Sequence, residues 1–147
     1  MFVIRKMREE DIMDAARLEE RIFSDAWSVS ALRESLRQKQ TILLCAFDDK
    51  KLIGYLVAYC VLEEGDVARI AVAPEYRRQG VGRRLLLELE GLCEDNGIEK
   101  LLLEVRESNE AARAFYEEYG FVKDGIRRNY YTEPSEDAVL MSRKIGR

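Results

Sequence analysis

The chain has 147 residues, about the length of one domain, and is long enough to bury a hydrophobic core. Its 24 basic and 28 acidic side chains leave a net charge of −4, which disfavours direct binding of nucleic acid, because that needs a clustered basic face. The histidine count is zero, which removes the commonest metal ligand and the commonest general base, so we expect no metal site.

Three cysteines, Cys45, Cys60 and Cys93, lie in apolar contexts without a Cys-x-x-Cys pair. An odd number without framework spacing argues against a disulfide scaffold and for a reducing compartment. The sequence shows neither a signal-peptide pattern nor a run of roughly 18 apolar residues. We therefore expect a cytoplasmic protein that does not bind a membrane.

The first half of the chain is predicted to form a strand, two helices and three further strands. Apolar residues recur at helical spacing in both helices, and Ser28 or Ser30 is available as the N-cap of the second. The next two strands are separated by DDKK, which reads as a hairpin, and Pro74 stops the last strand. In chain order these elements span 2–7, 9–23, 28–39, 41–47, 51–62 and 66–73.

The second half is predicted to alternate between helices and strands. A leucine-rich helix runs to Gly97, a short apolar strand covers 100–105, and a helix at 109–120 closes on a glycine. The last strands are expected at 121–131 and 138–145. No linker or repeat divides the chain, so residues 1–147 are expected to be a single α/β (α+β) domain with a mostly antiparallel sheet.

One stretch, RIAVAPEYRRQGVGRRLLLELE (residues 69–90), joins a strand to a helix through two glycines flanked by four arginines. Glycines let a backbone turn tightly and approach a ligand, and the first turn of a helix presents N–H groups that attract an anion. The spacing is neither that of a P-loop nor that of a dinucleotide fingerprint. The turn alone leaves two interpretations open, an anion site or a shaped turn with solvated arginines.

Three segments together resemble the GNAT N-acetyltransferases. Arg77-x-x-Gly80-x-Gly82 resembles their acetyl-coenzyme A loop, and residues 101–121 resemble the rest of their cofactor and catalytic region. IRRNYY followed by EDAVLM is similar to the members that acetylate the N-terminal alanine of a small-subunit ribosomal protein. The resemblance implies a mixed sheet of about seven strands with about four helices, and acetyl-CoA in a cleft between splayed central strands.

The same resemblance implies a set of coenzyme contacts. Strand backbone before the turn would hold the pantetheine arm, the turn would cradle the pyrophosphate, and the arginines would add long-range attraction. Asn109 would also bond to the coenzyme, although an asparagine before a helix is commonly just a cap. The residues implied are Ile70, Ala71, Val72, Arg78, Gln79, Gly80, Val81, Gly82, Arg83 and Asn109.

Glu104 is the candidate general base, because it interrupts an apolar strand at the position where the resemblance places the base. Burial would raise the pKa of its carboxyl and make it a better base near neutral pH. The alternative is a strand-end glutamate that pairs with Arg106 or another arginine.

Tyr116 is the candidate general acid for the departing thiolate. Asn109, Arg113 and Tyr116 fall on one helical face, which predicts Tyr116 at the edge of the buried side and within reach of a cleft. The neighbouring core stripe is expected to consist of Ala112, Phe115 and Tyr119. A packed aromatic residue is the commoner fate of such a tyrosine.

Trp27, Tyr130 and Tyr131 are the candidates for contact with an acceptor peptide, with core or rim packing as the alternative for Trp27. Ala26 stands where similar sequences often have proline, which leaves acceptor preference less defined than coenzyme binding.

Three functions remain to be compared: acetylation of protein N-termini, acetylation of lysines or small amines, and non-catalytic sensing of acyl-CoA.

Overall fold

The computed structural model describes residues 2–132 and 134–145, and over this part of the chain seven strands form one sheet with four α-helices. The sheet order is β1-β2-β3-β4-β5-β7-β6, and every neighbouring pair is antiparallel except β4 and β5. The elements are β1 (Phe2–Lys6), η1 (Glu9–Asp11), α1 (Ile12–Ile22), α2 (Val29–Arg37), β2 (Thr41–Asp48), β3 (Lys51–Val61), β4 (Glu64–Val72), η2 (Pro74–Tyr76), α3 (Val81–Asp95), β5 (Lys100–Arg106), α4 (Glu110–Tyr119), β6 (Val122–Thr132) and β7 (Ser135–Lys144).

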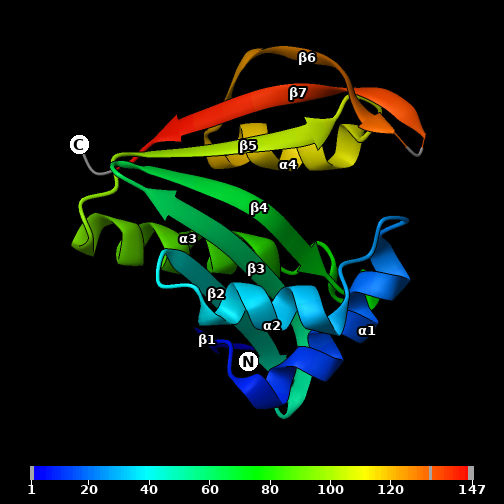
Figure 1. Ribbon diagram of the computed structural model, residues 1–147, viewed down its shortest axis with the longest axis vertical. Helices are drawn as coiled ribbons and strands as arrows, with labels where there is room; N and C mark the ends of the chain where they lie inside the picture. The colour runs from blue at the N-terminus through cyan, green and yellow to red at the C-terminus, as the bar shows by residue number, and fades with distance from the viewer. Residues whose placement is uncertain (1, 133, 146–147) are drawn as a thin grey trace.

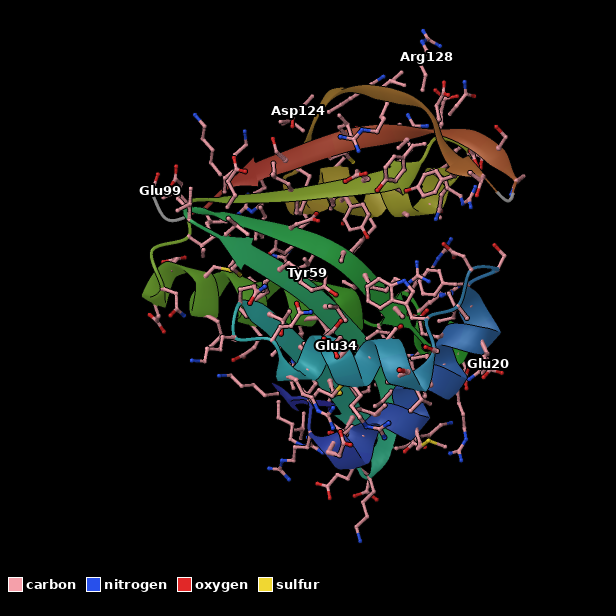
Figure 2. All side chains as sticks on the ribbon, viewed as in Figure 1. Glu20, Glu34, Tyr59, Glu99, Asp124 and Arg128 are labelled. Atoms are coloured by element: carbon pink, nitrogen blue, oxygen red, sulfur yellow. The ribbon has the colours of Figure 1, made fainter. Side chains whose placement is uncertain are left out.

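The helices cover both faces of the sheet, and side-chain alternation along the strands divides the core accordingly (Figure 1). Leu44 and Leu56 pack in the cluster that contains α3 and α4, whereas Cys45 and Tyr55 pack in the cluster that contains α1 and α2. Tyr59 also lies on the side of α2 (Figure 2), where its hydroxyl shares a 2.7 Å hydrogen bond with that of Ser35. The β-rich runs are therefore buried on two faces, which explains their nearly continuous apolar sequence.

The central strands β4 and β5 pair over only three residues each, from Glu64↔Lys100 to Asp66↔Leu102. Beyond this point β4 continues to Val72 and β5 to Arg106, and the two strands diverge (Figure 1). The splay leaves one edge of each strand without a neighbouring strand in the middle of the sheet. The expected fold, with a mostly antiparallel sheet and splayed central strands, is confirmed.

A β-bulge in β4 adjoins the start of the splay. Ala58 of β3 is opposite Val67 and Val57 is opposite Arg69, so Ala68 is an extra residue on β4. Such a bulge shifts the alternation of side chains by one position. Val67 and Ile70 consequently pack on the same side of the sheet, with α3, and Arg69 turns toward α1.

Local signals place the helix ends. Ser28 is the N-cap of α2, accepting a 3.0 Å hydrogen bond from the N–H of Ala31, so Ser28 rather than Ser30 fills that role. The helix expected at 9–23 begins with the short 3-10 turn η1 before α1. Among the residues that the structure describes, no helix has the length and apolar character needed to cross a bilayer.

Candidate active site

The loop between β4 and α3 has the geometry of an anion site. Arg78 and Gly80 both have positive φ, +64° and +84°, and Gly80 is the residue before the first turn of α3. The first backbone bond of the helix runs from the N–H of Arg84 to the carbonyl of Gly80, at 3.0 Å. The N–H groups of residues 81–83 precede that bond and are directed out of the helix end.

The two glycines of this loop are needed for different reasons. Gly80 has open space around its missing Cβ, so its requirement is conformational, because left-handed backbone strains other residues. A Cβ on Gly82 would instead lie 3.0 Å from the ring of Phe115. Gly82 therefore allows α3 to approach α4 closely, and its contact with a coenzyme stays a prediction.

Along the edge of β4 that faces the splay, the backbone N–H and carbonyl groups of every second residue point away from β3. The N–H of Ala73 donates to the carbonyl of Ile53 at 2.8 Å, so the antiparallel ladder directs the polar groups of Ala71 toward β3. Those of Ile70 and Val72 point away from β3, into the splay. Ala71 differs from these two residues because its backbone groups belong to the ladder with β3, and the contacts of all three with a coenzyme stay predictions.

The side chains around the loop mostly make contacts within the protein. Arg77 donates to the carbonyl of Val72 at 3.2 Å, and the amide of Gln79 donates to the carbonyl of Glu75 at 3.2 Å. Arg78 and Arg83 are exposed, which suits long-range attraction of an anion. The loop therefore offers an anion its backbone and the surrounding positive charge.

Asn109 caps α4, as its position before the helix suggests. Its side-chain oxygen accepts a 3.2 Å hydrogen bond from the N–H of Ala112. Arg113, one turn later, donates to the carbonyl of Glu107 at 2.8 Å and so ties the same helix start to the preceding loop. The capping role of Asn109 is shown, and its contact with a coenzyme stays a prediction.

Glu104 lies on β5 just beyond the last residue that pairs with β4. Its side chain is 26% exposed and projects on the opposite face from the buried Leu103 and Val105. One carboxylate oxygen, Oε2, is buried and has no hydrogen-bond partner among the described residues, although Arg127 Nη1 lies 3.8 Å away. A buried carboxylate oxygen without a donor is costly, and an amine in the splay would satisfy it.

The alternative in which Glu104 pairs with an arginine is met by Arg127 and not by Arg106. Arg106 lies 3.3 Å from the carboxylate of Glu136 on β7, and the arginine nearest Glu104 is Arg127 of β6. Asp66 of β4 also lies close, because it is opposite Leu102 and Glu104 follows two residues later on the same face of β5. Glu104 is thus placed between a carboxylate on one strand and a guanidinium on another.

Tyr116 lies deeper than the helical pattern predicts. It is 8% exposed and belongs to the core, whereas Ala112 and Phe115 of the expected core stripe are only half-buried. Its ring packs against those of Phe115 and Phe121, at centroid distances of 5.3 and 5.6 Å. Burial raises the pKa of its phenol, with Tyr131 adding to the effect, so the hydroxyl keeps its proton at neutral pH.

Tyr130 and Tyr131 lie together beside Glu104. Neighbouring residues of a regular strand point to opposite faces, but these rings meet edge to face at 5.0 Å, because β6 is irregular from Arg127 to Tyr131. Interaction with the carboxylate of Glu104 raises the pKa of Tyr130, and burial raises the pKa of Tyr131 to about 12. Two protonated phenols therefore flank Glu104.

Trp27 lies between α1 and α2 and packs against the core on that side of the sheet. The guanidinium of Arg69 lies 4.9 Å from the centre of its ring, so Trp27 packs as the alternative suggested, and its contact with an acceptor stays a prediction. The ring remains half-exposed. The α1–α2 loop, which contains Trp27, lies across the splay from the β6–β7 hairpin (Figure 1).

Residues 10–121 match the model of the acetyltransferase (GNAT) family. The chain belongs to the GNAT family. It is 36% identical over 148 residues to the ribosomal protein bS18-alanine N-acetyltransferase of Escherichia coli, covering 99% of both chains, and 33% identical over 145 residues to the enzyme of that name from Haemophilus influenzae, covering 97% and 98%. The crystal structure of the E. coli enzyme superimposes with a TM-score of 0.91, covering 100% of this chain and 96% of that one.

A second solved structure, Ard1 from Thermoplasma volcanium, has 26% identity and a TM-score of 0.91 over 99% of both chains. This GNAT protein is therefore close to RimI, the bS18-alanine N-acetyltransferase, in sequence and in fold. GNAT enzymes use acetyl-CoA, and the observed site fits it: positive φ at Gly80, the free end of α3, and the backbone of Ile70 and Val72 at an unpaired strand edge. Among the described residues, no cluster of His, Cys, Asp or Glu could hold a metal ion.

Two features of this GNAT site could not be found in the sequence. The first is the position of Asp66 beside Glu104, which depends on a bulge that the pairing with β3 produces. The second is the ion pair between Glu19 and Arg69, which are 50 residues apart. The only sequence signal is a glutamate within the apolar face of the first helix. Asp66 is exposed, but desolvation and the negative charge of Glu104 raise the pKa of its carboxyl.

Replacing Asp66 by asparagine is expected to increase the free energy of unfolding at pH 7. The pKa of Asp66 in the folded protein lies above its ordinary value of 3.8, so ionising the folded state costs stability as the pH rises through that pKa. The gain from Asp66→Asn should disappear at about pH 3, where the carboxyl is protonated in both states. Urea denaturation at both pH values measures this, with Glu64→Gln on the same strand as the control. A gain that is equal at both pH values would contradict the electrostatic cause.

Proposed function

We propose that this protein transfers the acetyl group of acetyl-CoA to the α-amine of an N-terminal alanine, with ribosomal protein bS18 as the acceptor. The observation that carries the proposal is the buried carboxylate oxygen of Glu104 at the splay, which accepts no hydrogen bond from the described residues and has only Arg127, 3.8 Å away, as a charged neighbour. It occurs in a chain that is 36% identical, over 99% of both lengths, to the E. coli enzyme of that activity.

In the proposed mechanism the amine attacks the thioester carbonyl directly. Glu104 accepts the proton that the amine loses, either directly or through a water, and Tyr116 donates its proton to the sulfur as the C–S bond breaks. Holding both reactants in the splay supplies the proximity that an acyl-enzyme would otherwise provide. A cysteine nucleophile has no histidine partner here, and burial raises the pKa of Cys45 and Cys93 to about 12.

An α-amine suits a single carboxylate base better than a lysine does. The α-amine has a pKa of roughly 7.7–8.0, against about 10.4 for lysine, so its deprotonation costs ~3.3 kcal/mol less at the same pH. Glu104 is a half-buried carboxylate with two phenols beside it and no imidazole. This favours N-termini over lysines and small amines, which remain the alternative acceptors.

The test is acetyl-CoA turnover with two peptides of the same sequence. One peptide begins with a free alanine, and the other has that amine blocked and a lysine available. Transfer to the free alanine alone supports the proposal and leads to the same assay with bS18 itself. Equal transfer to lysine points to a broader acetyltransferase, and coenzyme binding without transfer to either peptide points to a small-amine enzyme or an acyl-CoA sensor.

The coenzyme loop has its own prediction. Gly80→Ala should weaken acetyl-CoA binding about five- to thirtyfold, because the left-handed conformation costs roughly 1–2 kcal/mol with a side chain present. Gly91→Ala, on the open face of the same helix, is the matched control and should add about 0.5–1 kcal/mol of stability without changing affinity. Isothermal titration calorimetry and thermal denaturation measure the two effects. Unchanged affinity in Gly80→Ala would place the pyrophosphate elsewhere.

A further inference from the structure

Glu19 is a fully buried glutamate on the core-facing side of α1, at 0% exposure, whereas its neighbour Glu20 points into solvent (Figure 2). Both of its oxygens are bonded. Arg69 Nε lies 3.0 Å from Oε2 and Arg69 Nη2 lies 2.8 Å from Oε1, which is the two-pronged geometry of a strong ion pair. Oε1 also accepts a 2.8 Å hydrogen bond from the backbone N–H of Trp27.

Arg69 completes the contacts of the α1–α2 loop. Its guanidinium stacks 3.7 Å from the ring centre of Phe23 and 4.9 Å from that of Trp27, and only 12% of the side chain is exposed. It also donates to the carbonyl of Asp25 at 3.0 Å. Two side chains, one from α1 and one from β4, thus fix three residues of a six-residue loop.

This ion pair lies beside the proposed acceptor cleft. The bulge at Ala68 turns Arg69 toward α1 just beyond Asp66, the last residue of β4 that pairs with β5. The α1–α2 loop that Arg69 holds lies on the side of β4, and the β6–β7 hairpin lies across the splay from it (Figure 1). The loop and the hairpin thus border the splay from opposite sides (Figure 1).

We propose that Glu19 and Arg69 are positioning residues for the acceptor: their ion pair holds Asp25 and Trp27 as the fixed wall against which the acceptor N-terminus binds. The inference rests on the proposed function. A buried ion pair adds little stability compared with well-packed apolar residues, so its contribution here is a defined loop geometry. The predicted coenzyme contacts are with the backbone of Ile70 and Val72, whereas the Arg69 guanidinium bonds to Glu19 and to Asp25 on the other face of the sheet.

The test compares Glu19→Gln with Glu20→Gln in steady-state kinetics. Glutamine keeps an oxygen for the N–H of Trp27 and removes the charge that binds Arg69. We expect the acceptor KM to rise about tenfold, the effect of weakening roughly one charge-assisted hydrogen bond, while the KM for acetyl-CoA stays within about twofold. Glu20→Gln should change neither constant, because Glu20 lies in solvent.

A second variant and a second measurement separate this role from simple destabilisation. Arg69→Lys keeps the charge but loses the planar fork, so it should raise the acceptor KM less than Arg69→Met does. Trp27 is the single tryptophan of the chain, and its fluorescence reports the loop directly. Glu19→Gln and Arg69→Met should make it more accessible to acrylamide without abolishing acetyl-CoA binding.

The kinetic comparison uses whichever peptide the wild type accepts, alanine-terminated or lysine-bearing. If the proposed preference for N-terminal alanine is wrong, the roles of Glu19 and Arg69 can therefore still be tested. If the wild type accepts neither, peptide binding followed by Trp27 fluorescence replaces the KM. A loosened Trp27 with an unchanged acceptor KM or peptide affinity would overturn the inference. An equal rise in the KM for both substrates would also overturn it, because the pair would then act on the whole fold.

Discussion

Glu104→Gln is expected to lower kcat/KM for an alanine-terminated peptide by roughly 10²- to 10⁴-fold near pH 7, the usual contribution of a positioned general base. The amide has nearly the shape of the carboxylate but cannot accept the proton. At pH values above about 8 the α-amine loses its proton to solvent, so the loss should become smaller. A pH profile of kcat/KM for the wild type and the variant measures both effects.

The matched control is Glu107→Gln, an exposed glutamate in the loop that follows the same strand. This variant also removes one negative charge near the proposed cleft, and it should leave turnover unchanged. An equal loss in Glu104→Gln at every pH would contradict the general-base role. It would assign Glu104 to ordering Tyr130 and Arg127 instead.

Tyr116→Phe is expected to lower kcat by about 10²-fold, at the lower end of what a general acid supplies, while acetyl-CoA affinity stays the same. The ring packs against Phe115 and Phe121, and phenylalanine preserves those contacts, so stability should change little. The raised pKa of the phenol keeps it protonated at neutral pH, as a donor must be. Single-turnover kinetics and calorimetry separate transfer from binding.

Tyr119→Phe on the same helix is the control. The hydroxyl of Tyr119 donates to the buried carboxylate of Glu90, so this variant should lose stability, because that carboxylate loses a hydrogen bond. Its turnover at a temperature where it is folded should match the wild type. Wild-type turnover in Tyr116→Phe would end the general-acid assignment.

The sequence by itself determined the fold and the kind of site, because both depend on local patterns. Short β-rich runs bounded by turns predicted the seven strands, apolar residues at helical spacing predicted the four helices, and Ser28 and Asn109 act as helix caps. The turn at Gly80 requires a positive φ that glycine adopts most easily, so its position was visible in the chain. The resemblance to the GNAT family was confirmed by the family model, which matches residues 10–121.

Only the tertiary structure decided which side chains meet. The bulge in β4 turns Arg69 toward Glu19, and the irregularity in β6 brings Tyr130 and Tyr131 together, yet neither leaves a mark in the local sequence. A Cβ on Gly82 would lie 3.0 Å from the ring of Phe115, a residue 33 positions away in the sequence. Strand register and helix packing are set by the whole core at once, and a shift of one residue reverses the face of every side chain beyond it.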